Sequence, residues 1–237
     1  MKSSHLLVTF FLALGFVAQD VSFIYAMERS KASPASPSGA WPRLTSFVKQ
    51  NLHWLFLYFA SQRSINEQLL QSAMEGNIDG VRAAIDQGAD VFAIQNNDGY
   101  TALHLATVYC HTDTVKALLN VSGIDAATLI TIQNRNGRTA LHEAAVSGLT
   151  DIVNALLAGM GPDRAATLIT IQDCTGRTAL HMAAAGGHTD IVTALLNVPG
   201  IDAATLMTIK NRDGNTALDL AKAQGNTDTV KALLYRE

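Results

Sequence analysis

The feature that most constrains this chain of 237 residues is a six-residue motif that occurs four times. The copies read Thr-Ala-Leu-His-Leu-Ala, Thr-Ala-Leu-His-Glu-Ala, Thr-Ala-Leu-His-Met-Ala and Thr-Ala-Leu-Asp-Leu-Ala, and they begin at Thr101, Thr139, Thr178 and Thr216. Each copy follows a turn that ends in Gly. Each precedes a second segment of the form Thr-Asp-x-Val-x-Ala-Leu-Leu, at 112–119, 150–157, 189–196 and 227–234. Because the copies start 38, 39 and 38 residues apart, they indicate stacked repeats that bury their apolar faces against one another.

These motifs resemble the ankyrin repeat family, whose signature is Thr-Pro-Leu-His-x-Ala. The resemblance implies an all-α fold, a solenoid of about five helix-turn-helix repeats with a period of ~38 residues instead of the usual ~33. The repeat domain is expected to cover 64–237, with repeats at approximately 64–97, 98–135, 136–174, 175–212 and 213–237. The first of them is degenerate, as expected of a terminal repeat.

The surplus length of the repeats holds a second recurring segment, with the sequence Asp-Ala-Ala-Thr-Leu at 125–129 and relatives at 163–171 and 202–209. An Asp ahead of Ala-Ala-Thr-Leu predicts a short capped helical turn. The following Thr-Leu-Ile-Thr-Ile stretch also suits a β-strand. We favour the helical turn.

Several repeated residues are expected to shape the helix ends. Thr101, Thr139 and Thr178 stand where a side-chain oxygen can bind free amides at the start of the first helix, and Thr112 and its equivalents are expected to do the same for the second helix. The turn between the two helices holds Gly148, Gly187 and Gly225, because a positive φ there is cheapest for glycine. Cys110 occupies the equivalent position in its repeat, which predicts local strain or a reshaped turn.

Three histidines recur once per repeat, at His104, His142 and His181. Equivalent residues of adjacent helices should lie about 8–10 Å apart, whereas zinc requires ligands about 2 Å from the metal. The spacing therefore argues against a metal site. The family resemblance implies instead that these histidines tie adjacent repeats together through hydrogen bonds.

The region ahead of the repeats divides into three parts. Residues 1–26 combine a basic start, an apolar core and a small final residue, which predicts a secretory signal peptide. An uncleaved anchor is the alternative, although it would bury Asp20 at a cost of about 2.5–3.5 kcal/mol. Residues 27–42 are rich in Pro and Ser and are expected to be a disordered linker. Residues 43–63 predict an aromatic amphipathic helix, either a cap on the repeat stack or a helix in peripheral contact with a membrane surface.

Charge and composition exclude several classes of function. Residues 1–63 carry six Lys/Arg against two Asp/Glu, whereas 64–237 carry eleven against eighteen. An acidic repeat domain argues against nucleic-acid binding, which needs a clustered basic surface. No phosphate-binding loop, nucleophile elbow or metal-ligand spacing is present, so we expect no cofactor, no metal and no catalytic activity. An enzyme using Cys110 or Cys174 is the remaining alternative of a different class.

The expected function is therefore recognition of a protein partner by a monomeric scaffold. In the ankyrin family, partners are usually bound by loop tips and by the exposed side of the first helices. Carried over to this sequence, the family pattern points to Asp98, Tyr100, Tyr109, Arg135, Arg138, Arg177 and Arg212. Tyr and Arg are enriched at binding hot spots. The first helices of the third and fourth repeats present small residues. This suggests a shallow groove with arginines along its rim, which suits an acidic or extended partner.

If the predicted signal peptide directs export, two hypotheses for the biological role remain. The first is a secreted, effector-like adaptor that a microbe releases to bind host proteins. The second is an envelope-resident protein, held by the 43–63 helix, that supports or inhibits a neighbouring protein.

Overall fold

The computed structural model describes residues 41–95, 98–160 and 162–235, with side-chain burial described from residue 58 onward apart from residues 95, 162 and 163. The chain divides into two compact units, Met1–His53 and Trp54–Glu237, and the second unit holds the repeats. The predicted signal peptide at 1–26 and most of the predicted linker at 27–42 lie outside the described residues.

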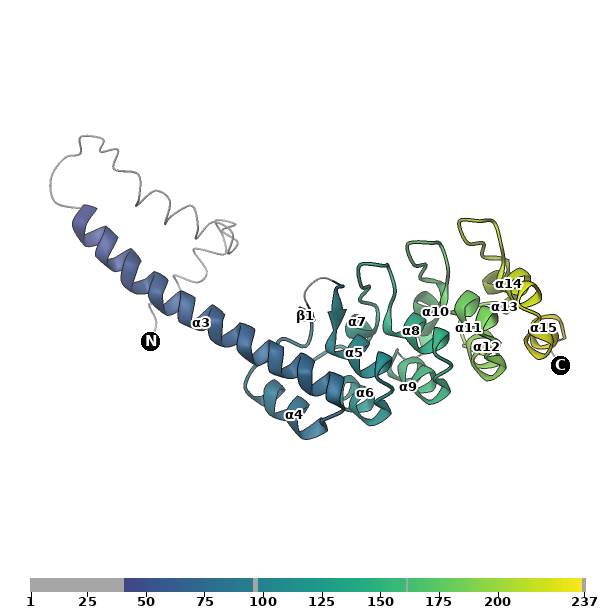
Figure 1. The fold of residues 1–237 in the computed structure, drawn as a ribbon, viewed down its shortest axis with the longest axis horizontal. Helices are drawn as coiled ribbons and strands as arrows, with labels where there is room; N and C mark the ends of the chain where they lie inside the picture. Colours follow the sequence, from purple (N-terminus) through teal and green to yellow (C-terminus); the bar gives the residue numbers. More distant parts are fainter. Residues whose placement is uncertain (1–40, 96–97, 161, 236–237) are drawn as a thin grey trace. The chain divides into compact units, whose positions relative to one another are not determined.

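The described chain is almost entirely helical, which confirms the predicted all-α solenoid. The first helix of each clear repeat carries the recurring motif, in α5 (Ala102–Val108), α8 (Ala140–Val146), α11 (Ala179–Gly186) and α14 (Ala217–Ala223). The second helices are α6 (Thr112–Leu119), α9 (Thr150–Met160), α12 (Thr189–Leu196) and α15 (Thr227–Leu234). Helices of the same kind pack side by side in rows (Figure 1).

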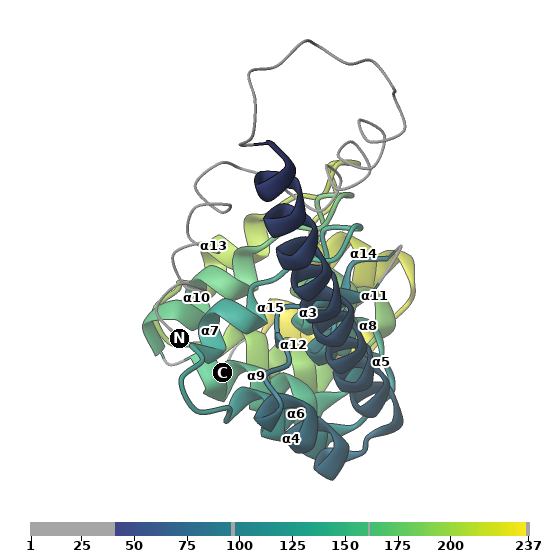
Figure 2. The same cartoon turned by 90° about the vertical axis from the view of Figure 1, so that its left-hand side faces the viewer.

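The recurring Asp-Ala-Ala-Thr-Leu segments form short helices, which confirms the prediction that we favoured over a strand. They are α7 (Ala126–Ile130), α10 (Pro162–Thr170) and α13 (Ala203–Thr208). Asp125 and Asp202 cap two of them, accepting hydrogen bonds from backbone N–H groups two residues on, at 3.2 Å in both cases. These helices form a third row, on the opposite side of the second helices from the first helices (Figure 2). Their buried Leu129, Leu168 and Leu206 extend the shared apolar core.

The degenerate first repeat contains the end of α3 (Trp41–Glu75) and α4 (Ile78–Asp86). The predicted 43–63 helix is therefore not a separate element, because α3 continues through residue 63 into the first repeat. Tyr58 and Phe59 are exposed, and from residue 58 onward the first buried side chain of α3 is Leu69. The choice between a cap and a membrane-surface helix stays a prediction for 43–57, whose side chains lie outside the described part. Among the described helices, none has a stretch long and apolar enough to cross a bilayer.

A two-residue antiparallel strand pair joins the first and second repeats. β1 (Ile94–Gln95) pairs with β2 (Tyr100–Thr101), with Ile94 opposite Thr101 and Gln95 opposite Tyr100. The pair ends at Thr101, which is the N-cap of α5.

The prediction that Thr112 and its equivalents cap the second helices is wrong. The N-cap positions of α6, α12 and α15 are His111, His188 and Asn226, and none of them makes a side-chain cap bond. Their side chains bind the preceding repeat instead: His111 Nε2 lies 3.0 Å from the Met74 carbonyl oxygen, and Asn226 Nδ2 donates to the Ala184 carbonyl at 3.0 Å. His188 Nε2 makes the same kind of contact with the Val146 carbonyl at 3.3 Å. The polar side chain at the cap position therefore joins repeats together.

The strain predicted at Cys110 is present, and the structure explains why it is tolerated. Cys110 has a φ of 62°, the only positive φ of a non-glycine residue in the described chain, while the equivalent Gly148 has 73°. A Cβ placed on Gly148 would lie 2.6 Å from the His188 ring of the next repeat. In the repeat that follows Cys110, the residue equivalent to His188 is Leu149, which carries no imidazole ring. Cys110 and Leu149 therefore stand at the two positions that Gly148 and His188 occupy one repeat later, and both residues differ from that Gly–His pair.

A double-mutant cycle tests this pairing. We expect Cys110→Gly to raise the free energy of unfolding by about 1 kcal/mol, because a left-handed conformation costs a residue with a Cβ about that much. Leu149→His should be tolerated better when combined with Cys110→Gly than in the wild-type chain, by about 1 kcal/mol or more, since the ring then meets no Cβ and can bind the Val108 carbonyl. Urea denaturation of the four proteins measures the coupling. Additive effects would contradict the pairing.

Candidate functional site

Each of three histidines bridges two repeats. The Nδ1 atom accepts a hydrogen bond from the backbone N–H of the Thr at the start of the same helix, at 3.3, 3.2 and 3.2 Å for His104, His142 and His181. The Nε2 atom lies 3.0, 3.2 and 3.2 Å from a carbonyl oxygen of the next repeat, on Arg138, Arg177 and Asn215. Because a backbone N–H can only donate, Nδ1 is unprotonated and Nε2 donates its proton to the carbonyl. This is the inter-repeat contact that the family resemblance implied.

Burial holds these imidazoles in the neutral form. Desolvation lowers the pKa of His104 to about 4, against the effect of its hydrogen bond to the Arg138 carbonyl. Desolvation is also the largest cause of the lowered pKa of His142 and of His181. Within the part of the chain that the structure describes, no group of three or more His, Cys, Asp and Glu residues is placed to hold a metal ion.

The last repeat has Asp219 in place of the histidine. Its Oδ2 accepts hydrogen bonds from the Thr216 backbone N–H at 2.9 Å and from the Thr216 hydroxyl at 2.7 Å. A carboxylate keeps the cap at the helix start but has no proton to donate to a further carbonyl. These bonds to Thr216 lower the pKa of Asp219.

The loops ahead of the first helices are anchored by buried Asn and Asp side chains that the sequence analysis did not single out. Asn134, Asp173 and Asn211 each accept two backbone N–H bonds through Oδ1, from the residues two and four positions on, at 2.8–3.0 Å. The signal was present in the sequence, because an Asn or Asp stands three residues ahead of each turn glycine. Burial alone would raise the pKa of Asp173, but hydrogen bonds from Thr175 and from the Arg177 backbone outweigh it, and the pKa is lowered.

Hydrogen bonds between neighbouring loops place the loop tips in one row. The backbone N–H groups of Arg135, Cys174 and Arg212 donate to the carbonyl oxygens of Asp98, Asn136 and Thr175 of the preceding loop, at 3.1, 2.9 and 3.0 Å. The side chains of Asp98, Arg135 and Arg212 are exposed on this row, as expected of residues available to a partner.

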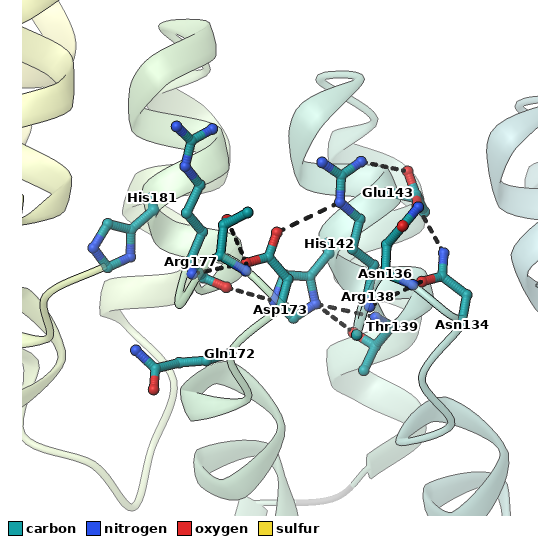
Figure 3. Close-up of polar contacts among 12 residues, drawn as sticks. Asn134, Asn136, Arg138, Thr139, His142, Glu143, Gln172, Asp173, Arg177 and His181 are labelled. Carbon is teal, nitrogen blue, oxygen red and sulfur yellow. Dashed lines mark hydrogen bonds and ion pairs between the residues drawn. The ribbon is translucent and has the colours of Figure 1, made fainter. Parts of the chain in front are cut away.

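Arg138, a predicted partner-binding residue, is held by two buried carboxylates (Figure 3). Its Nη1 lies 3.7 Å from Glu143 Oε2, and its Nε lies 3.6 Å from Asp173 Oδ2 of the next repeat. The Glu143 and Asp173 side chains are only 7% and 1% exposed. Buried carboxylates need a nearby cation, so Arg138 has a structural role. Arg177 has no such ion pairs with the described residues, and its guanidinium points the same way as that of Arg138 in Figure 3.

The two predicted tyrosines differ in their surroundings. Tyr100 is half-buried, with its ring edge-on to the His104 ring at a centroid distance of 5.7 Å. Burial and then the nearby Glu143 carboxylate raise the pKa of Tyr100. Tyr109 is 51% exposed at the end of α5, beside Val108 at 41%, and Val146 at the end of the adjacent α8 is 43% exposed. We call Val108, Tyr109 and Val146 the apolar patch.

The two cysteines are free and exposed. His111, which follows Cys110 in the chain, already uses Nε2 to bind the Met74 carbonyl. The Cys110 thiol donates to the Val108 carbonyl oxygen at 3.9 Å, and within the described residues no hydrogen bond joins it to the His111 ring.

Comparison with known families agrees with this geometry. A family model for ankyrin repeats, described as Ankyrin repeats (3 copies), matches residues 69–167 and 161–237. Comparison with curated proteins finds no match. The match covers all of the repeats whose capping threonines, bridging histidines and buried loop anchors are described above. This chain belongs to the ankyrin repeat family.

Proposed function

We propose that this chain is a non-catalytic scaffold that binds a protein partner through its loop tips and the exposed ends of its first helices. Ankyrin repeats are generally protein–protein interaction modules. The observation that carries the proposal is the apolar patch of Val108, Tyr109 and Val146, on two first helices that pack side by side. Exposed apolar groups on adjacent helices are typical of interaction surfaces.

Tyr109 is the residue of this patch expected to contribute most to binding, because a large, half-exposed ring is a frequent hot spot. A photo-crosslinking amino acid at position 109 should capture a discrete partner from cells, and excess unlabelled protein should compete with that capture. The same amino acid at position 116, on a second helix, is the control. Equal capture at both positions, or none at 109, would argue against the proposed surface.

Once the partner is captured, Tyr109→Ala should weaken its binding by about tenfold, the effect of losing about 1.4 kcal/mol of contact energy. Tyr235→Ala is the matched control, since Tyr235 is an exposed tyrosine that lies after α15 and outside the patch. Isothermal titration calorimetry measures both variants. A loss of affinity that is equal for the two substitutions would contradict a role specific to the patch.

We also propose that the protein is exported and acts as a secreted, effector-like adaptor. The layout of residues 1–26 supports this proposal, since a basic start, a short apolar core and a final small residue are the parts of a secretory signal. Mass spectrometry of the mature protein in each cell fraction tests it. A species that starts at Met27 in the medium is the expected result. An intact species retained in the envelope would favour the envelope-resident role instead.

A further inference from the structure

Arg138 and Arg177 occupy the same position in consecutive repeats. Each stands directly before the capping Thr of a first helix, donates its backbone N–H to a buried loop anchor, and accepts a hydrogen bond at its carbonyl from the preceding histidine. The backbone surroundings of the two arginines are therefore matched, and the difference between them lies in their side-chain partners.

The carboxylates that hold Arg138 have no counterpart around Arg177. The residue equivalent to Glu143 is Met182, and the residue of the next repeat equivalent to Asp173 is Asn211. Asn211 Nδ2 donates to Asp213 Oδ2 at 3.5 Å, and among the described residues no ion pair joins that carboxylate to Arg177.

The Nε atoms of both arginines are buried and make no hydrogen bond within the described structure. The Nε of Arg138 nevertheless has the Asp173 carboxylate 3.6 Å away, whereas that of Arg177 has no such anion among the described residues. A buried donor without a partner is costly, and the Asp173 carboxylate that offsets this cost at Arg138 has no counterpart at Arg177.

Two further cations flank Arg177 on the row of loop tips. Arg135 and Arg212 are exposed, and among the described residues neither makes an ion pair. The Arg212 backbone N–H donates to the Thr175 carbonyl at 3.0 Å, which places its loop directly against the loop that precedes Arg177. Asp98 and Asp213 are also exposed on this row, so its charge is mixed, and among the described residues neither of these carboxylates makes an ion pair with Arg135, Arg177 or Arg212.

We propose that Arg177 binds a carboxylate of the protein partner, an Asp or Glu side chain, with Arg135 and Arg212 as flanking cations. The planar guanidinium fork matches a carboxylate and binds it more strongly than a neutral acceptor. The partner segment would supply to Arg177 the anion that Glu143 and Asp173 supply to Arg138. This inference rests on the proposed function and names the chemistry of the partner.

The test uses the full chain and a short fluorescein-labelled peptide of Glu-Gly-Ser repeats, followed by fluorescence anisotropy at low salt. Gln-Gly-Ser repeats and the same peptide with phosphoserine in place of Glu are the comparison probes. Arg177→Gln should weaken binding of the Glu peptide about tenfold, as expected for loss of a charge-assisted contact. Arg82→Gln, on α4, removes an exposed arginine elsewhere and should change binding less than about twofold.

A second variant leaves Arg177 in place. Met182→Glu with Asn211→Asp reproduces around Arg177 the two carboxylates that surround Arg138. The variant should therefore occupy the guanidinium internally and weaken the Glu peptide about as much as Arg177→Gln does. Circular dichroism checks that each variant is folded, and because this variant replaces other residues, it keeps the test decisive if Arg177→Gln is unstable.

Three results would overturn the inference: no binding of the Glu peptide by the wild-type protein, equal binding of the Gln peptide, or binding that neither variant weakens. Tighter binding of the phosphoserine peptide than of the Glu peptide would overturn the assignment of a carboxylate. If crosslinking at position 109 persists while the peptide fails to bind, only this inference fails. If the peptide binds as expected while position 109 captures no partner, the proposed function fails instead.

Discussion

His142→Leu is expected to lower the free energy of unfolding by about 3 kcal/mol, the largest effect of any single substitution considered for this chain. The ring is fully buried and joins three groups: the backbone N–H and hydroxyl of Thr139, and the carbonyl of Arg177 in the next repeat. A leucine makes none of these bonds. Each buried polar group left without a partner costs about 1–3 kcal/mol.

Urea denaturation of the full chain measures this effect, with His188→Leu as the matched control. His188 is partly exposed and makes one longer bond, of 3.3 Å, to the Val146 carbonyl. Its replacement should cost about 1 kcal/mol or less. If the two substitutions cost the same, the buried bridge between repeats is not a main source of stability.

Acidification is the second large effect, because the bridging histidines fold in the neutral form. A lowered pKa means that the unfolded chain binds more protons than the folded chain between the two pKa values, so stability rises with pH in that window. For His104 the window runs from the ordinary value of 6.5 down to about 4. Its contribution is complete above pH 6.5 and is lost as the pH falls toward 4, a change of about 3 kcal/mol. His142 and His181 shift in the same direction and add to it.

Urea denaturation between pH 7.5 and 4.5 at constant ionic strength measures this dependence. The lowered pKa values of Asp173 and Asp219 affect stability only at more acidic pH, because these carboxylates are ionised in both states across most of this range. His142→Leu should reduce the slope of stability against pH, since one buried neutral imidazole is gone. A stability that stays flat between pH 7.5 and 5 would show that the imidazoles accept protons without loss of structure.

Much of the fold followed from local signals. The 38-residue period, the Thr at the start of each first helix and the Gly between helices predicted the rows of first and second helices. Asp125 and Asp202 predicted the short inserted helices correctly. These predictions succeeded because a cap or a turn depends on residues a few positions apart in the sequence. The caps assigned to Thr112, Thr189 and Thr227 failed, because the residue before each of these three threonines is the N-cap and its side chain binds the preceding repeat.

The candidate site was predicted less well, and the arginines show why. From the sequence, Arg138 and Arg177 were both predicted to bind a partner, since both precede a capping Thr. The structure separates them, because two buried carboxylates hold Arg138 and none of the described carboxylates holds Arg177. The loop anchors Asn134 and Asp173 were also missed, although their recurrence ahead of each turn glycine was visible.

The sequence by itself determined the family, the helical repeat and the register of the first-helix caps, since these depend on contacts within one repeat. Only the tertiary structure decided which polar side chains are used inside the stack and which remain for a partner. The physical reason is that the partner of each such side chain lies in the neighbouring repeat, some 34–42 residues away in the sequence. Cys110 is tolerated because the neighbouring repeat has a leucine where a histidine ring would otherwise lie. Arg177 has no anion within the described chain because the neighbouring repeat has an amide where Arg138 meets a carboxylate.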